Sequence, residues 1–438
     1  MQLNLLKIYE SVFFEKVMFF LIVIYSFFYI SSPDLIKDFY NVFLLFSLPV
    51  VFLKFNFFKV DRMFWFLSSV VLIQTLSWGS SIYYFSGIEN DIPKIDRLAK
   101  LFGFVFIAYW LKGSNARVIL VFSSCVLGFL YSIFLSEDFI SQLSLSMQSY
   151  RVDFGIKNAQ FTSMFSGVFL LIALFFLLLP YEKAWYKKIV ITLIILTLIS
   201  ILVWILIISQ SRQVWLSIFI VLILYPLIYR LIHKGGVKIY LSYFFILIFL
   251  GGVSQTTTIK KRLIEQTFEN ESSLLVSIIN GDLNEIKSEG NGIRINSWIE
   301  SIAWVKSHPL IGSGPNAIKE VIKQSDKFTE QQKVKFRHLH SFHIEILVAY
   351  GILGSLVIYG MYYWLIRSLV LAHRENPELK MFTVLAVCFL IFWIIINFFE
   401  SFSSRSYGVY VHNIMFGCLY TFYFAQQRKK IEEAEACA

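Results

Sequence analysis

The feature that most constrains this chain is a series of apolar runs, each close to the length that crosses a lipid bilayer. A transmembrane helix needs about 20 predominantly apolar residues, with a range of roughly 17–25. Because the hydrocarbon core offers no partners to backbone polar groups, such spans must be helical. Windows of this kind predict twelve helices, the fourth of them short: 12–30, 39–58, 63–85, 98–112, 117–135, 158–179, 187–209, 213–232, 237–253, 343–366, 381–399 and 405–425.

The composition excludes the other broad classes of protein. Of the 438 residues, 57% are hydrophobic, only 16% are charged and 46 are Phe. A soluble protein has no interior large enough to cover so much apolar surface. The four cysteines indicate no disulfide framework, because three lie inside apolar runs and Cys437 lies in the terminal tail. The chain is therefore predicted to be an all-α polytopic integral membrane protein, with 1–438 forming a single membrane domain.

The distribution of Lys and Arg predicts the orientation of the chain, because cytoplasmic loops are enriched in both. With a cytoplasmic N-terminus, the inward segments hold 19 Lys and Arg and the short outward loops hold 8. This split favours two cytoplasmic termini. We attribute the net charge of +10 to topology and to anionic partners, and predict no nucleic-acid binding, because no basic domain carries interleaved surface aromatics.

One hydrophilic segment, about 254–342, is large enough to form an extracytoplasmic subdomain, between the ninth and tenth helices. Within it, residues 293–306 have apolar positions at helical spacing and predict an amphipathic helix that lies on the membrane or on the helix bundle. The sequence HPLIGSGPN, residues 308–316, follows it with Pro and Gly turn chemistry.

Common catalytic signatures are missing from the sequence. It contains no phosphate-binding P-loop, dinucleotide fingerprint, HExxH sequence or GxSxG nucleophile elbow. It also has no Asp-x-Asp pair to hold a divalent ion. Any energy the protein uses must therefore come from an ion gradient or from an activated substrate.

Three histidines, His338, His340 and His343, cluster where the long loop re-enters the membrane. They can be interfacial polar residues. A metal site is the second reading, although Cys is absent and the spacing matches no standard ligand motif. The third reading is a general base, since a neutral imidazole titrates near physiological pH and can deprotonate a hydroxyl nucleophile.

Arginines form the second candidate feature. Arg212 lies between the seventh and eighth spans, Arg294 begins the amphipathic helix, and Arg151 stands in an outward loop. Each can be an interfacial anchor, but the guanidinium fork also binds phosphate oxygens in a bidentate manner. Together with the histidines, they suggest chemistry on a phosphorylated lipid at the outer leaflet.

Two motifs match a known family. His340 and Ser341 are followed by nine residues, then Gly351 and Gly354, and Arg212 begins an Arg-x-x-x-Leu sequence. In the long loop, Arg294 precedes a Trp-containing helix and the HPLIGSG turn. Over about 205–355 the chain therefore resembles the O-antigen ligase family of bacterial envelope glycosyltransferases.

The resemblance implies an all-α fold similar to GT-C-type glycosyltransferases, with about 12 transmembrane helices and a periplasmic loop at 254–342. It implies a multi-pass protein of the bacterial inner membrane, whose donor is undecaprenyl-pyrophosphate-linked O-antigen. The acceptor would be lipid A–core oligosaccharide. The reaction would be inverting and would need no metal or other cofactor.

Roles for individual residues follow from the resemblance and from the chemistry above. His340 is the expected catalytic base, with His338 and His343 as secondary candidates. Arg212, Arg294 and Arg151 are expected to bind the diphosphate, and no metal ligands are expected. Grooves between helices would accommodate the lipid chains of the substrates, and the sequence identifies no protein partner.

Alternatives remain open at this point. An O-antigen polymerase or a protein O-oligosaccharyltransferase would use the same class of donor and differ in the acceptor. A transporter of lipid-linked sugars is less favoured, because ionisable residues such as Glu15, Glu345 and Glu400 lie near predicted span ends and no internal repeat is present.

Overall fold

The structure, a computed structural model, describes residues 7–84, 96–179, 184–233, 251–252, 255–260, 274, 276–283 and 286–437. Within these ranges the regular elements are all helical. They are α2 Val12–Phe28, α3 Pro33–Leu53, α4 Phe55–Phe58, α5 Arg62–Tyr84, α6 Asp96–Ala99, η1 Lys100–Gly103, α7 Phe104–Leu111, α8 Asn115–Phe134, α9 Phe139–Met147, α10 Ala159–Leu178, α11 Trp185–Ile208, α12 Arg212–His233, α14 Thr257–Lys260, α16 Gly292–Ser307, α17 Ala317–Lys323, α18 Glu330–Lys335, α19 Phe342–Glu375, η3 Pro377–Leu379, α20 Lys380–Phe399, η4 Phe402–Ser404 and α21 Ser406–Cys437.

Eight helices in the described part are long and apolar enough to cross a membrane: α3, α5, α8, α10, α11, α12, α19 and α20 with its preceding turn. The chain is thus a polytopic all-α protein, as predicted. The short fourth window, 98–112, is built from η1 and α7 after the single turn of α6. The ninth predicted span, 237–253, lies almost entirely outside the described residues, and the total of twelve stays a prediction.

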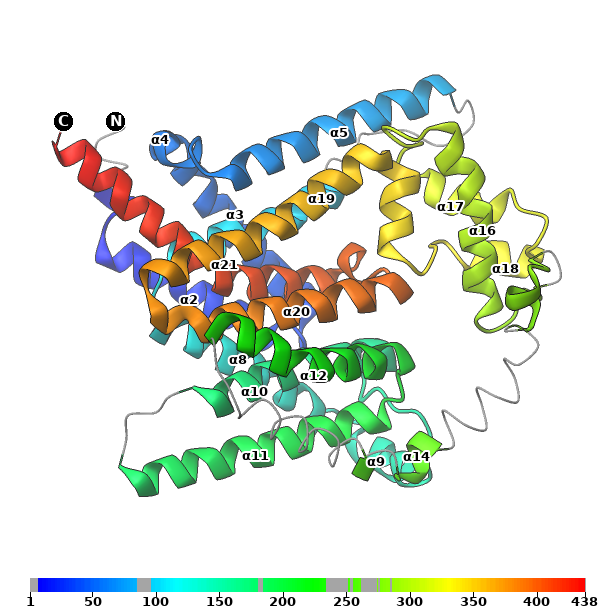
Figure 1. The fold of residues 1–438 in the computed structure, drawn as a ribbon, viewed down its shortest axis with the longest axis horizontal. Coiled ribbons are helices and arrows are strands. Elements are labelled where there is room, and N and C mark those ends of the chain that lie inside the picture. Colours follow the sequence, from blue (N-terminus) through cyan, green and yellow to red (C-terminus); the bar gives the residue numbers. More distant parts are fainter. Residues whose placement is uncertain are drawn as a thin grey trace.

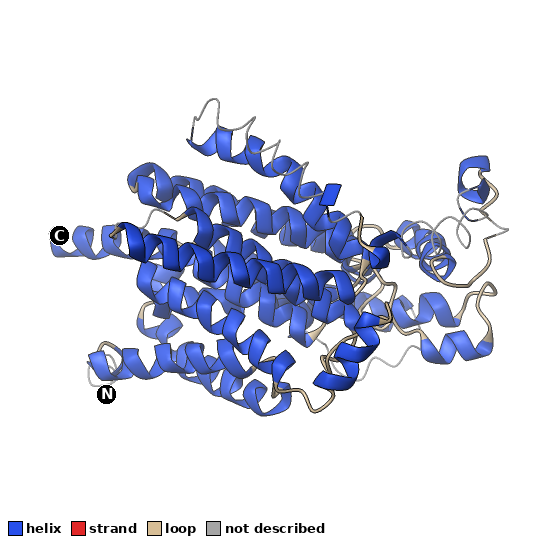
Figure 2. Cartoon of the chain, turned by 90° about the horizontal axis from the view of Figure 1, so that it is seen from below, coloured by secondary structure: helices blue, strands red, loops and turns tan. Residues whose placement is uncertain are grey.

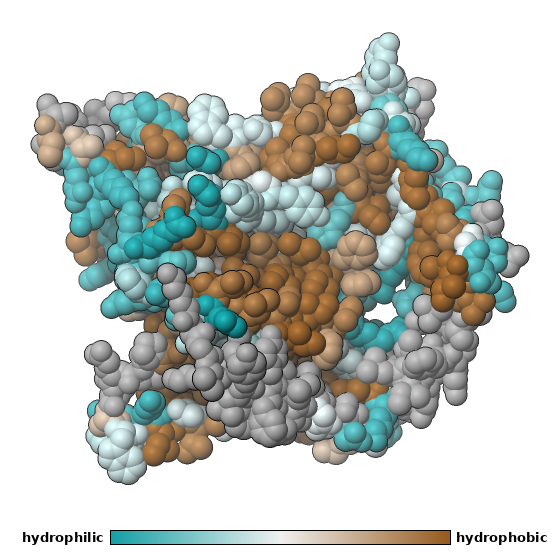
Figure 3. Space-filling model, in the orientation of Figure 1, coloured by the Kyte–Doolittle hydropathy of each residue, from teal (hydrophilic) through white to brown (hydrophobic). Residues whose placement is uncertain are grey.

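The long helices form a bundle (Figures 1 and 2), and some of them are joined by short connections, such as 112–114 between α7 and α8 and 209–211 between α11 and α12. Both termini lie at one end, and α16, α17 and α18 lie at the other, which we call the distal end. Helix α10 is central, with 78% of its most apolar window buried, whereas the corresponding value for the peripheral α11 is 28%. Figure 3 shows the apolar band that results across the middle of one face, with hydrophilic residues gathered toward the ends.

Helix α16 is formed by the segment that was predicted to be amphipathic, and it lies against the bundle. It contacts α17 and the start of α19. The indole Nε1 of Trp298 donates to the carbonyl oxygen of Leu339 at 2.9 Å. This contact joins the long loop to the backbone immediately before His340.

Helix α19 is broken at Gly351, whose backbone (φ 63°, ψ −162°) lies in a region that only glycine adopts readily. The break frees backbone groups on both sides, and the HPLIGSG turn binds them. Carbonyls of Pro309 and Leu310 accept from the amides of residues 352 and 353 at 2.8 and 3.1 Å. The amides of Ser313 and Gly314 donate to the carbonyls of residues 348 and 349 at 2.8 and 3.0 Å. The turn therefore holds the two parts of α19, the helix that begins directly after His340 and Ser341, in a fixed arrangement.

We expect Gly351→Ala to destabilise the protein. The left-handed backbone costs Ala about 1–3 kcal/mol, and its Cβ would lie 2.4 Å from the carbonyl oxygen of Leu310. Gly79→Ala is the matched control, because a Cβ there meets no atom within 4 Å and α5 is regular around it. Thermal unfolding in detergent should show a lower Tm for Gly351→Ala and an unchanged or higher Tm for the control. Equal Tm values for wild type and Gly351→Ala would show that the break is not under constraint.

Candidate functional site

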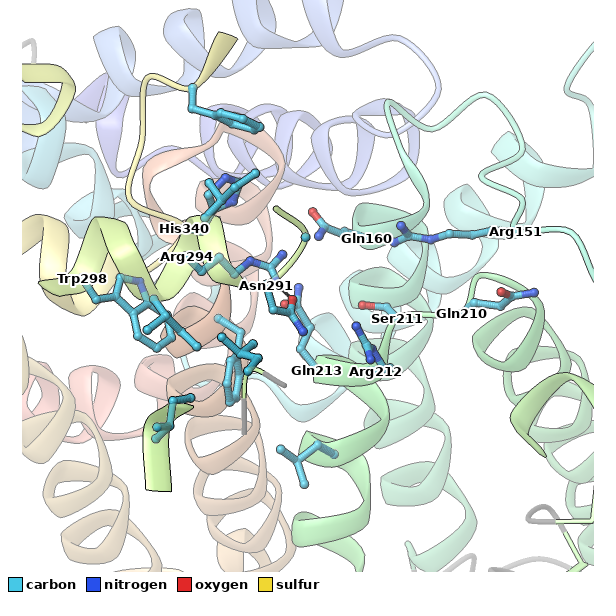
Figure 4. A pocket seen from close by; sticks show the side chains of 18 residues that line it. Arg151, Gln160, Gln210, Ser211, Arg212, Gln213, Asn291, Arg294, Trp298 and His340 are labelled. Atoms are coloured by element: carbon cyan, nitrogen blue, oxygen red, sulfur yellow. Dashed lines mark hydrogen bonds between the residues drawn. The ribbon is translucent and has the colours of Figure 1, made fainter. Parts of the chain in front are cut away.

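A cavity of about 570 Å³ opens at the distal end, between the bundle and α16. Figure 4 shows the side chains that line it. Four of the residues singled out from the sequence, Arg151, Arg212, Arg294 and His340, line this one cavity. They come from four separate segments, so the fold rather than local sequence brings them together.

A tight turn between α11 and α12 places the first two arginines. Gln210, in the turn, has a left-handed φ of 52° and its side chain donates to the carbonyl of Ser149 at 2.8 Å. Arg151 Nε donates to the carbonyl of Ser209 at 3.1 Å. The loop that carries Arg151 is therefore fastened to the turn that precedes Arg212, the first residue of α12.

The backbone around His340 is held on both sides. His340 itself has a left-handed φ of 52°, a region that few residues other than glycine adopt. On one side, Leu339 is fixed through its amide, which donates to Glu345 Oε1 at 3.2 Å, and through the Trp298 bond to its carbonyl. On the other side, the hydroxyl of Ser341 caps α19. These contacts aim the imidazole at the cavity.

The imidazole of His340 contacts a carboxylate. Its Nδ1 lies 3.2 Å from Oε2 of Glu400, the residue that ends α20. A carboxylate only accepts hydrogen bonds, so Nδ1 carries the hydrogen. The lone pair of the neutral ring is therefore on Nε2. This is the arrangement in which a carboxylate orients a histidine base.

Glu400 is buried and surrounded by donors. Its Oε1 accepts from the amide of Ser401 at 3.1 Å and lies 3.5 Å from His338 Nε2. Its Oε2 accepts from the amide nitrogen of Gln160 at 3.1 Å, in the amide orientation that satisfies both neighbours of that side chain. In this orientation the Gln160 oxygen accepts from Arg294 Nη2 at 3.2 Å, and the same Nη2 lies 3.9 Å from Glu400 Oε2.

Burial and these contacts set the protonation states. Burial lowers the pKa of His340 below its ordinary value of 6.5, although the bond to Glu400 acts to raise it. Burial acts to raise the pKa of Glu400, but the hydrogen bonds from His338 and His340 hold it well below 4.5. Around neutral pH the pair consists of a neutral imidazole and an ionised carboxylate.

The other two histidines do not line this cavity. His338 lies beside His340, with the two ring centroids 4.0 Å apart, and lines a separate cavity. His343 has both ring nitrogens engaged: Nε2 donates to the carbonyl of Ile394 at 2.9 Å, and Nδ1 accepts from the Tyr359 hydroxyl at 2.6 Å. His343 therefore joins α19 to α20, and its geometry leaves no nitrogen for chemistry in the cavity.

A metal ion deserves consideration, because ligand atoms of His338, His340 and Glu400 all lie within 4.8 Å of one another. The histidine spacing alone indicated no such group, since its third member is 60 residues away from His340. The Arg294 guanidinium, however, lies beside the same carboxylate. A second cation at this point would be repelled by it, so the arrangement fits an arginine-paired carboxylate better than a metal centre.

Sequence reasoning missed two polar members of the site, Glu400 and Gln160. Glu400 was noted only as an acid near the end of a span. The signal available was a single carboxylate directly after 19 residues without charge (381–399), since ionisable residues at such positions are rarely accidental. Gln160, at the start of α10, had no signal of its own.

The chain was compared with known proteins. The family model for O-antigen ligase matches residues 196–359, which encloses the segment 205–355 where the resemblance was predicted. A search of curated proteins gave no match. The matched region contains Arg212, Arg294 and His340. Members of the family have O-antigen ligase or polymerase-type activity, which is a glycosyltransferase chemistry. The match supports assignment of the segment 196–359 to the O-antigen ligase family.

Proposed function

We propose that this protein transfers O-antigen polysaccharide from undecaprenyl pyrophosphate to a sugar hydroxyl of lipid A–core oligosaccharide, at the periplasmic face of the bacterial inner membrane. The observation that carries the proposal is the cavity in which a carboxylate-bound histidine faces three arginines. The cavity lies at the end of the bundle opposite both termini, in agreement with cytoplasmic termini and a periplasmic site.

His340 is the proposed general base. Its Nε2 accepts the proton of the acceptor hydroxyl while the oxygen attacks the anomeric carbon of the donor sugar. The bond from that carbon to the pyrophosphate oxygen breaks on the opposite face, so the configuration inverts. The electron pair leaves with the pyrophosphate, and Glu400 stabilises the imidazolium that forms.

The three arginines are the proposed stabilisers of the leaving group. Negative charge on the diphosphate grows as the bond breaks, and donors that are already in place stabilise it without reorganisation. Arg294 also contacts Gln160 and Glu400, so it links the proposed diphosphate site to the carboxylate that contacts His340. An activated sugar–pyrophosphate bond supplies the energy, so no nucleotide site is required.

Apolar side chains also line the cavity, with Leu216, Ile278 and Phe399 among them. We propose that they hold the first isoprene units of the donor. The remainder of the polyprenyl chain would extend along the apolar exterior of the helix bundle.

Lipopolysaccharide gel profiles of a ligase-deficient strain complemented with this gene test the proposal. A restored ladder of long chains on lipid A–core is the expected result. Lipid-linked polymer that accumulates without the ladder would overturn it. Polymerase or protein O-oligosaccharyltransferase activity would instead produce longer lipid-linked polymer or glycosylated protein.

We expect Arg212→Lys and Arg294→Lys to lower activity nearly as much as Ala does, because a point charge does not reproduce the two-pronged contact. For Arg212, kcat should fall about 10²–10³-fold, the usual effect of losing one donor to a developing anion. Arg294, on a loop helix, should change both kcat and the donor KM. Arg230→Lys, at the opposite end of α12, is the control. Wild-type kinetics in both test variants would show that neither arginine contacts the phosphates.

Transfer should also survive EDTA. Arginine is proposed to neutralise the diphosphate, and Arg294 lies beside Glu400, the carboxylate that contacts His338 and His340. Purified donor, acceptor and enzyme in detergent avoid the effect of chelators on intact outer membranes. Complete loss of turnover, restored by one added metal, would instead assign His338, His340 and Glu400 as ligands.

A further inference from the structure

A second, smaller cavity of about 200 Å³ lies beside His338. Its charged lining comes from three segments: α6 and the start of η1, the residues before α19 together with its first turn, and the residues around η4. It contains four basic residues besides the histidine, namely Arg97, Lys100, Arg337 and Arg405.

The two carboxylates of this cavity do not balance its positive charge. Glu345 is buried and already engaged: its oxygens accept from the hydroxyls of Ser401 and Ser404 at 2.7 and 3.1 Å, and Arg97 lies 3.6 Å away. Asp96 is the other acid. Among the described residues, Lys100, Arg337 and Arg405 form no ion pair. Several cations that line a concave space without acidic partners are the usual setting for an oxyanion.

The position of this cavity is as informative as its charge. His338 lines it, whereas His340 lines the larger cavity, and the two rings bind opposite oxygens of Glu400. Each cavity is therefore lined by one of two adjacent histidines that share a carboxylate. A group bound beside His338 would lie close to the proposed base, because the ring centroids of His338 and His340 are 4.0 Å apart.

We propose that this second cavity binds an oxyanion, a phosphate or carboxylate substituent, on the acceptor saccharide, and so positions the attacking hydroxyl at His340. The inference rests on the proposed function, which supplies the donor and the reaction. The arginines of the larger cavity bind the leaving diphosphate, and the cations of the smaller one bind the acceptor. The division explains why one active site carries two separate clusters of positive charge.

Lys100→Gln and Arg405→Gln test the proposal in a reconstituted transfer assay. Arg97 is left intact, because its removal would leave Glu345 buried without its counter-ion. Each variant should raise the KM for native lipid A–core about tenfold, the value of a charge-assisted hydrogen bond. The donor KM and kcat should stay near wild type. Lys306→Gln, which removes an exposed cation from the end of α16 outside both cavities, is the control.

Two modified acceptors identify the anion. One is lipid A–core after hydrofluoric acid dephosphorylation, and the other is lipid A–core with its carboxyl groups reduced. With the correct group removed, wild type should show the raised KM and the variants should add nothing to it. Equal effects of the variants on every acceptor would overturn the proposal, as would a raised donor KM.

Bulk lipid headgroups offer the same chemistry, so the assay is repeated in nanodiscs with and without phosphatidylglycerol. A variant effect that appears only with phosphatidylglycerol would overturn the proposal in favour of a lipid site. Failure of the proposed function is distinguishable, because wild type would then transfer nothing to lipid A–core. Normal wild-type transfer with unaffected variants rejects the acceptor site alone.

Discussion

His340→Ala should abolish detectable transfer while the protein remains inserted and folded. Loss of a general base costs about 10²–10⁴ in rate, and the buried Glu400 keeps its contacts with Ser401, Gln160 and His338 when this side chain is removed. The measurement is kcat with purified donor and acceptor, together with the Tm of each preparation. His373→Ala, at the opposite end of α19, serves as the control for loss of a histidine.

The neighbouring histidines sharpen this result. His338→Ala should be milder, because it removes one donor to Glu400 but leaves the base. His343→Ala should lower the Tm and leave kcat close to the wild-type value, because its ring joins α19 to α20. If His340→Ala keeps near-normal turnover, the base has been assigned to the wrong residue.

The acid limb of the pH–rate profile gives a second measurement on the same group. Protonation of His340 removes the base, so kcat/KM should fall as pH drops through its pKa. Because burial lowers that pKa, the midpoint should lie below 6.5. Glu400, with a pKa below its ordinary 4.5, remains ionised across this range.

The apolar runs made the polytopic all-α class predictable from sequence, since hydrophobic thickness fixes helix length and position-specific packing is not needed to recognise a span. The helix at 293–306 was also predicted, but the sequence did not show whether it lies on the membrane or on the helix bundle. The position of this helix against the bundle depends on contacts such as the one between Trp298 and the Leu339 carbonyl, which join residues far apart in sequence.

The candidate site was predictable only in part: residues that lie in short sequence motifs could be found, and residues that are defined by long-range contacts could not. Arg212 and His340 sit in short motifs, so local sequence marks them. Gln160 has no local signature and Glu400 has only a weak one, because both act through contacts 60 or more residues away in the chain. In sequence, His343 is indistinguishable from its two neighbours. In the structure it lies in the first turn of α19, where its side chain points to α20 and not to the cavity.

Glu400→Gln carries the other large expected effect, because this substitution keeps the shape of the side chain and changes only what it accepts. The described polar contacts of the carboxylate come from donors or from groups that donate here: Ser401, Gln160, His338, His340 and Arg294. An amide in this position presents an NH₂ group to donors in either orientation. Where that NH₂ faces His340, it donates to Nδ1 and shifts the ring hydrogen to Nε2.

The shifted tautomer has no lone pair toward the acceptor, so we expect kcat to fall about 10²–10⁴-fold, as when the carboxylate of a catalytic triad becomes an amide. The residual activity carries the sharper test. Glu400 raises the pKa of His340 against burial, so its neutralisation should move the acid limb of kcat/KM to lower pH. A merely structural role for Glu400 would lower kcat and the Tm together and leave the limb in place. Glu375→Gln, an acid at the opposite end of α19, controls for the loss of one carboxylate. An unshifted limb in Glu400→Gln would therefore separate the carboxylate from the base, even if activity were lost.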